Sequence, residues 1–217
     1  MGIDIETAKK IRAAHSLGDA RSVLAPIVDE RYQVLGERIK RSKEELETDW
    51  SKLAPIFWPL VFGLTEHRWL HSEYNVVVSA FHRGLSDWEG SRVAVGATLD
   101  RCWRLRIAAH EIVLSHVVQI LRARYPRDVV PDTIAWAFAE NTTVFILDDP
   151  RLRGFWPSVP PAGSYFKESN YPQLEPLEPG LLSCWTRRTS FQAYMDKAIK
   201  ILEKGLRSNQ ANPRDSD

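Results

Sequence analysis

The chain has 217 residues, 44% of them hydrophobic, with 29 lysines and arginines against 28 aspartates and glutamates. This length and apolar content suffice for the core of one domain, so neither disulfides nor a structural metal are needed on grounds of size. The net charge of +1 and the local balance of acids and bases disfavour nucleic-acid binding, because phosphate recognition needs a basic surface.

The two cysteines, Cys102 and Cys184, are too few for a disulfide framework or a four-cysteine zinc site. The N-terminal residues lack the apolar segment of a secretory signal. The longest apolar run, 55–64, is interrupted by Pro59 and Gly63 and is too short to span a membrane. We therefore expect a cytoplasmic protein with reduced thiols and no membrane association.

Two helices are predicted at the start of the chain, at about 5–16 and 19–47. Asp19 is the expected N-cap of the second helix, whose apolar residues recur at helical spacing among opposite charges four residues apart. Pro26 lies near its second turn, where proline is poorly tolerated, so the helix could begin a few residues later. The pattern is typical of an amphipathic helix that packs one stripe against the protein.

Three helical segments are predicted in the middle of the chain. A proline-interrupted apolar segment at 53–64 precedes a predicted helix at 65–84, with Thr65 as its cap and Gly84 as its stop. A long helix follows at about 91–125. Another is predicted at about 132–147, although the β-branched residues of its NTTVF section fit a helix less well.

Residues 148–187 contain seven of the 13 prolines and cannot form one helix. The segment also carries aromatic residues that are normally buried, such as Trp156, Phe166 and Trp185. We expect an ordered loop that wraps the helical body, since long loops of this kind often carry function. A final helix is predicted at about 189–206, followed by a disordered tail at 207–217.

These elements predict an all-α fold. We expect a single helical domain at 1–206, built from about five to seven helices, with residues 148–187 as a Pro-rich wrapping segment. Its core is expected at 65–147, braced by the long N-terminal helix. The chain has no internal repeat and no low-complexity segment.

The stretch AHEIVLSHVVQIL, at 109–121, carries His110, Glu111 and His116 and comes close to the HExxH pattern of zinc proteases. In that pattern the two histidines are four residues apart, or about 40° around a helix, so both can hold one ion. His110 and His116 are six residues apart, which separates them by about 240°. One regular helix cannot direct both at the same ion, and the zinc-protease interpretation is excluded.

The inward side of this helix holds a candidate catalytic pair, His110 and Arg106. On a helical wheel, apolar residues such as Ile107 and Leu114 lie within about 60° of His110, and Arg106 falls on the same arc, whereas Glu111 lies at the edge of the polar side. A buried histidine and arginine must be hydrogen-bonded or open onto a cavity, because burying either unpaired costs several kcal/mol. The alternatives are a structural core histidine and a pair that lines a pocket.

The candidate metal ligands are His67 and His71. Their spacing in the predicted 65–84 helix would let two imidazoles share a divalent cation, with His110 or an acid of the long loop as a third ligand. Histidine pairs at this spacing are common by chance, and a seam of hydrogen-bonded histidines explains them equally well. The sequence contains no GxxxxGK[ST], GxGxxG, GxSxG, EF-hand or CxxC pattern.

Three functions are compatible with these observations. We favour a protein–protein interaction or regulatory module, because the charge is balanced, aromatic residues are many and no catalytic motif is present. The second is a helix-bundle enzyme with a His- and Arg-lined site, metal-dependent if His67 and His71 are ligands. The third is a ribonuclease-like enzyme in which His110 transfers a proton and an arginine holds phosphate. A protein is thus the expected partner, and nucleic acid is less favoured.

Overall fold

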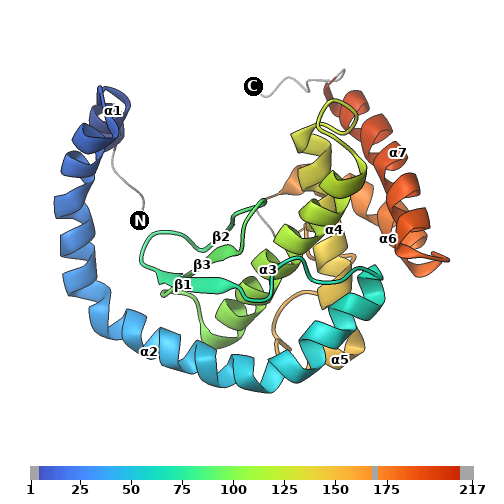
Figure 1. Ribbon diagram of the computed structural model, residues 1–217, viewed down its shortest axis with the longest axis horizontal. Helices are drawn as coiled ribbons and strands as arrows, with labels where there is room; N and C mark the ends of the chain where they lie inside the picture. The colour runs from blue at the N-terminus through green and yellow to red at the C-terminus, as the bar shows by residue number, and fades with distance from the viewer. Residues whose placement is uncertain (1–4, 168–170, 211–217) are drawn as a thin grey trace.

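The computed structural model describes residues 5–167 and 171–210 of the chain (Figure 1). Within these residues it contains seven α-helices, one 3₁₀ helix and a sheet of three strands. The prediction of a mostly helical protein is confirmed. The prediction of a purely all-α fold is wrong, because a sheet lies between the first long helix and the central helices.

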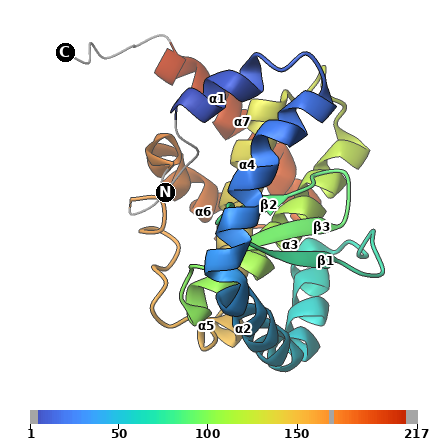
Figure 2. The ribbon, with the colours of Figure 1, turned by 90° about the vertical axis from the view of Figure 1, so that its left-hand side faces the viewer.

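The longest element is α2, Leu17–Thr65, a single helix of 49 residues. We predicted a helix ending near residue 47 and an interrupted segment after it, but the helix continues through Pro26, Pro55 and Pro59. A proline inside a helix removes a backbone donor and bends the axis. Figure 1 shows α2 as a curved outer rim of the molecule, and Figure 2 shows the strands on one side of it and α6 on the other.

Capping groups define both ends of α2, which follows the short α1, Ile5–Arg12. At the N-terminus, Ser16 Oγ accepts from the backbone N–H of Asp19 at 3.1 Å, so Ser16 rather than the predicted Asp19 is the N-cap. At the C-terminus, Glu66 adopts a left-handed φ of 59°. Its carboxylate accepts from the backbone N–H of Phe191 at 3.2 Å and thereby caps the start of the last helix.

The sheet that follows α2 has the strand order β1-β3-β2. The first strand, β1, Asn75–Ser79, pairs in parallel with β3, Arg92–Gly96. The short β2, Gly84–Ser86, pairs antiparallel with the other edge of β3. The central strand places Val93 and Val95 in the core, with exposures of 2% and 0%.

The predicted helix at 65–84 is wrong for a reason visible in the sequence. Three consecutive valines, 76–78, are β-branched and favour an extended chain. Exposure alternates along β1, from 53% for Val77 to 8% for Val78, as expected of a strand. Thr65 therefore ends α2 instead of starting a helix, and Gly84 begins β2.

Two central helices, α3, Arg101–Arg124, and α4, Asp132–Leu147, pack side by side. The bounds predicted for α4 are confirmed, whereas α3 begins later than the predicted residue 91 because β3 precedes it. Asp100 is the N-cap of α3, and its Oδ1 accepts from the backbone N–H of Trp103 at 2.9 Å. Most of α3 and nearly all of α4 are buried, so the two helices form the centre of the core.

The described parts of the wrapping segment, 148–167 and 171–187, bury aromatic side chains in the core, but they contain short helices where we predicted a loop. The segment forms three short helices, α5 (Pro150–Arg153), the 3₁₀ helix η1 (Pro172–Leu177) and α6 (Glu178–Thr186). Trp156 and Phe166 anchor it at 0% exposure. Gly163 has a φ of 90°, which favours glycine, and its N–H donates to Glu178 Oε1 at 2.6 Å.

The last helix, α7, Phe191–Gln210, packs against α4 and α6. Residues 207–210, predicted to belong to the tail, are part of this helix, and the rest of that tail, 211–217, lies outside the described residues. In the described part of the chain, no helix combines the length and the apolar character needed to cross a membrane.

Candidate functional site

A cavity of about 530 Å³ opens beside α3, in the range of about 300–1,000 Å³ that small-molecule sites occupy. One wall is formed by α3 through Trp103, Ile107, His110 and Glu111, and α4 adds Glu140. The remaining lining comes from the start of β2, from the loop between β3 and α3, and from the wrapping segment through Pro160, Tyr165 and Tyr171. Elements distant in sequence thus meet at this cavity.

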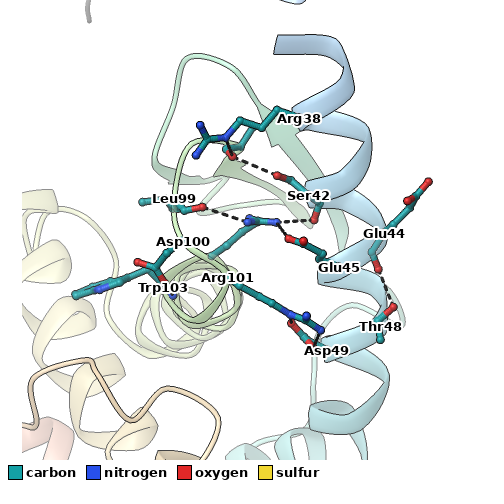
Figure 3. A network of polar contacts seen from close by, with 12 residues as sticks. Arg38, Ser42, Glu44, Glu45, Thr48, Asp49, Leu99, Asp100, Arg101 and Trp103 are labelled. Carbon is teal, nitrogen blue, oxygen red and sulfur yellow. Dashed lines mark hydrogen bonds and ion pairs between the residues drawn. The ribbon is translucent and has the colours of Figure 1, made fainter.

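Hydrogen bonds from α2 hold the loop between β3 and α3, which lines the cavity (Figure 3). Arg38 donates to the carbonyl oxygens of Ala97 and Thr98, at 3.1 and 3.0 Å. Ser42 Oγ donates to Ala97 O at 3.2 Å. These bonds give the loop carbonyls partners and fix the loop against the outer helix.

Arg104 is the buried link between α2 and α3, with an exposure of 5%. Its guanidinium donates to Ser42 O at 3.0 Å and to Leu99 O at 3.1 Å, and it pairs with Glu45 Oε2 at 2.9 Å. A planar guanidinium can make these bonds at once because its donors point in fixed directions. Arg104 therefore fixes the start of α3, and with it the wall of the cavity.

Behind the cavity, Arg106, His110 and Glu140 form a chain of polar contacts. Arg106 Nη1 lies 3.3 Å from His110 Nδ1, and His110 Nε2 lies 3.1 Å from Glu140 Oε2. The three residues are 2%, 5% and 5% exposed. A guanidinium can only donate, so Nδ1 accepts and the imidazole carries its hydrogen on Nε2, which donates to Glu140. The structure thus brings the predicted pair together, and His110 reaches the cavity.

The guanidinium of Arg106 lies between aromatic rings. It is 5.7 Å from the ring centroid of Trp156 and 5.3 Å from that of Tyr165, both in the wrapping segment. Burial lowers the pKa of Arg106 and raises the pKa of Tyr165. Cation–π contacts offset part of the cost of burying this charge, so the wrapping segment helps to hold Arg106 in place.

Sequence reasoning missed Glu140, the partner of His110. Its second oxygen, Oε1, accepts from Trp136 Nε1 at 3.1 Å, so both carboxylate oxygens are anchored. One signal was present: Glu140 is the only charged residue between Asp132 and Asp148. A carboxylate in so apolar a helix is rarely buried without a partner.

Glu111 lies at the cavity and not in solvent, although the wheel placed it at the polar edge of the helix. Burial raises the pKa of its carboxyl group, an effect that the neighbouring His110 partly opposes. The polar side of α3 faces the strands: Ser115 Oγ donates to the carbonyl oxygens of Asp87 and Gly90 at 3.1 and 3.0 Å. Glu111 is therefore half-buried beneath β2.

Gly84→Ala is expected to lower the free energy of unfolding by about 1–2 kcal/mol. A Cβ at residue 84 would lie 2.6 Å from Glu111 Oε1 and 2.8 Å from Ile107 Cγ2, so both side chains must move. Urea denaturation measures the loss. Gly63→Ala is the matched control, because its Cβ meets nothing within 4 Å and alanine stabilises a helix interior by about 0.5–1 kcal/mol. A stability of Gly84→Ala equal to that of the control would contradict the close approach.

The candidate metal ligands His67 and His71 lie in the connection between α2 and β1, so the helical spacing on which the metal hypothesis depends is absent. His67 Nδ1 is 2.6 Å from Thr65 O. Among the described residues, no group of three or more His, Cys, Asp or Glu side chains is placed to hold one ion. The metal hypothesis therefore stays a prediction, and the described residues provide no set of ligands for it.

His116 faces away from His110, as their angular separation requires. His116 is 0% exposed, and its Nε2 lies 3.5 Å from Thr65 Oγ1. Its ring stacks on that of Trp69, with the ring centroids 4.2 Å apart. Burial lowers the pKa of His116 to about 4. The two histidines of α3 therefore belong to different environments, one at the cavity and one in the core.

Comparisons with protein families, with curated proteins and with solved structures find no match to this chain. The class of site therefore rests on its geometry: a cavity of small-molecule size with a buried His–Glu pair and a carboxyl group of raised pKa in its lining. Perturbed titratable groups gathered in a cleft are typical of acid–base sites.

Proposed function

We propose that the protein is an enzyme that acts on a small molecule in this cavity by general acid–base chemistry. The observation that carries the proposal is the Glu111 carboxyl group, which lines the cavity beside the His110–Glu140 pair and has a raised pKa. A carboxyl group with a raised pKa holds its proton closer to neutral pH and can donate it and take it back. Glu111 is thus the proposed proton carrier.

The other residues of the site have distinct roles in this proposal. His110 lines the cavity, and Arg106 fixes its tautomer by donating to Nδ1. Glu140, held by Trp136, accepts from Nε2 and orients the ring. Arg106 and Glu140 are therefore positioning residues, and Glu111 and His110 are the groups that meet the substrate. Tyr165, protonated because burial raises its pKa, can supply a further hydrogen bond.

Glu111→Gln tests the proposal directly. Glutamine keeps the size of the side chain but cannot carry the proton, so kcat is expected to fall about 100-fold or more with the fold preserved. The substrate is sought by incubating the purified protein with a metabolite extract and following depletion by mass spectrometry. Glu73→Gln is the control, an exposed glutamate between α2 and β1 that is outside the cavity lining. A wild-type rate for Glu111→Gln would refute the proposal.

A second readout needs no substrate. The Glu111 carboxyl carbon is assigned by NMR as the resonance that is missing from Glu111→Gln, and its titration gives the pKa of Glu111 in the free protein. We expect a pKa above the ordinary value of 4.5, because burial disfavours the charged form. An ordinary pKa would remove the basis for Glu111 as a proton carrier.

The ribonuclease-like alternative is weaker, because Arg106 is buried behind His110 and does not belong to the cavity lining among the described residues. It therefore does not present its guanidinium to a phosphate. A metal-dependent reaction also lacks support, since neither His67 nor His71 is among the described residues that line this cavity.

A protein partner is the second candidate function. Its support is single exposed apolar side chains along the first half of α2, where Leu17, Tyr32 and Val34 are 82%, 46% and 77% exposed on different sides of the helix. The double variant Leu17→Asp, Val34→Asp is expected to lose a protein that the wild type captures from its native host. Capture of that same protein by the double variant would argue against Leu17 and Val34 as contacts of the partner.

The proposal places the protein in the cytoplasm. Cys102 and Cys184 are both free and half-buried in the structure. Unpaired thiols suit a reducing compartment, where disulfides are rare. Fractionation of native cells would test this location.

A further inference from the structure

Acidic side chains dominate the charged lining of the cavity. Asp100, Glu111 and Glu140 contribute carboxyl groups from the start of α3, from α3 itself and from α4. Arg83 is the one lysine or arginine among the lining residues that the structure describes, and it is exposed. Solvent screens the exposed Arg83 and Asp100 more than it screens the half-buried Glu111 and the buried Glu140, so the lining favours a positive ligand over a negative one.

The buried Arg106 does not reverse this preference. Its Nη1 donates to His110 at 3.3 Å, and its guanidinium carbon lies 5.7 and 5.3 Å from the ring centroids of Trp156 and Tyr165. These contacts hold the cation behind the imidazole and outside the cavity lining. Arg106 therefore serves the His110–Glu140 pair and is not presented to a ligand.

Aromatic side chains supply the other part of the lining. Trp103, Tyr165 and Tyr171 come from α3 and from the wrapping segment, and Ile107 adds aliphatic surface. Aromatic faces attract ammonium and guanidinium groups, and Tyr165 already lies against the guanidinium of Arg106. A cavity of about 530 Å³ is far larger than a bare ammonium group, so its ligand also needs an apolar body.

We infer that the ligand of this cavity is a small organic cation, with an ammonium or guanidinium group directed at Glu111 and an apolar body against Trp103 and Tyr171. The inference rests on the proposed function, because it concerns the same cavity, and it adds the chemical class of the substrate. A cationic group beside Glu111 also suits acid–base chemistry, since an amine can exchange a proton with that carboxyl group.

The test compares three probes of nearly equal shape: phenethylamine, which is a cation at neutral pH, phenethyl alcohol, which is neutral, and phenylacetate, which is an anion. Isothermal titration calorimetry on the full chain gives their dissociation constants. Phenethylamine is expected to bind about tenfold more tightly than either other probe, since an ion pair and a cation–π contact add to the same apolar burial. Glu111→Gln is expected to remove this preference and leave the affinity for phenethyl alcohol unchanged, whereas the control Glu73→Gln keeps it.

Two results would overturn the inference. Equal or tighter binding of phenethyl alcohol or phenylacetate would show a cavity that does not select a cation. Failure of all three probes to bind at millimolar concentrations would show that no ligand of this class is recognised. Neither result decides the proposed acid–base function, which is judged by the pKa of Glu111 in the free protein. An ordinary pKa together with cation-selective binding would retain the ligand class and reject the enzyme.

Discussion

Glu140→Ala is expected to lower the free energy of unfolding by about 3–5 kcal/mol, because it breaks a buried ionic network by removing one partner. The carboxylate is 5% exposed and accepts from His110 Nε2 and Trp136 Nε1, each at 3.1 Å. Its loss leaves the buried His110 and the half-buried Trp136 without an acceptor and leaves the buried charge of Arg106 with less compensation. Chemical denaturation at neutral pH measures the change.

Two variants serve as references for this experiment. Glu44→Ala removes a carboxylate from the exposed face of α2, where Glu44 accepts from Thr48 Oγ1 through its backbone oxygen (Figure 3), and should change stability by less than about 0.5 kcal/mol. Glu140→Gln keeps one acceptor oxygen and loses the other, so an intermediate loss is expected. A loss below about 1 kcal/mol for Glu140→Ala would contradict a buried network at this position.

The orientation of His110 could be predicted from the sequence because it depends on the geometry of one regular helix. The spacing places Arg106 on the same side as His110 and His116 on another, and the contacts of each residue confirm this. Glu140 lies on a different helix, and local periodicity does not determine which faces of α3 and α4 meet. The sequence therefore predicted correctly that Arg106 and His110 lie on the same side of α3, but it did not predict that Glu140 is the partner of His110.

Glu111 shows a different limit of sequence reasoning. The wheel assigned it to the polar edge of α3, and polar residues are commonly assumed to face water. Here that side is covered by β2 and its flanking loop, so close that a Cβ on Gly84 would collide with the carboxyl group. We predicted a helix that stops at Gly84, where β2 begins, and predicted no strand after it, so the error in the fold also concealed the environment of the site.

The sheet escaped prediction because its strands are short and their partners are distant. β1 and β3 have five residues each, too few for a clear periodic signal, and each was included in a longer predicted helix. Pairing of Val76 with Val93 and of Val78 with Val95 supplies the stabilisation that the local sequence lacks. Strand preference depends on such tertiary neighbours more than helix preference does.

Acidification is expected to destabilise the fold by up to about 3 kcal/mol through His116 alone. Burial lowers the pKa of His116 from 6.5 in a free imidazole to about 4. Between these values the unfolded chain binds a proton that the folded chain does not, so stability rises with pH across this window. The contribution is fully present above pH 6.5 and is lost as the pH falls towards 4, since one pKa unit corresponds to about 1.4 kcal/mol.

His116→Phe isolates this contribution, because phenylalanine keeps a flat ring to stack on Trp69 but cannot titrate. His67 and His71 remain in both proteins, as does Glu111, whose raised pKa changes stability in the opposite direction. Urea denaturation of both proteins from neutral pH to about pH 4 should show their difference in unfolding free energy changing by about 3 kcal/mol, and staying constant at higher pH. Parallel pH profiles would show that His116 titrates in the folded protein like a free imidazole, and that it is not sealed in the core.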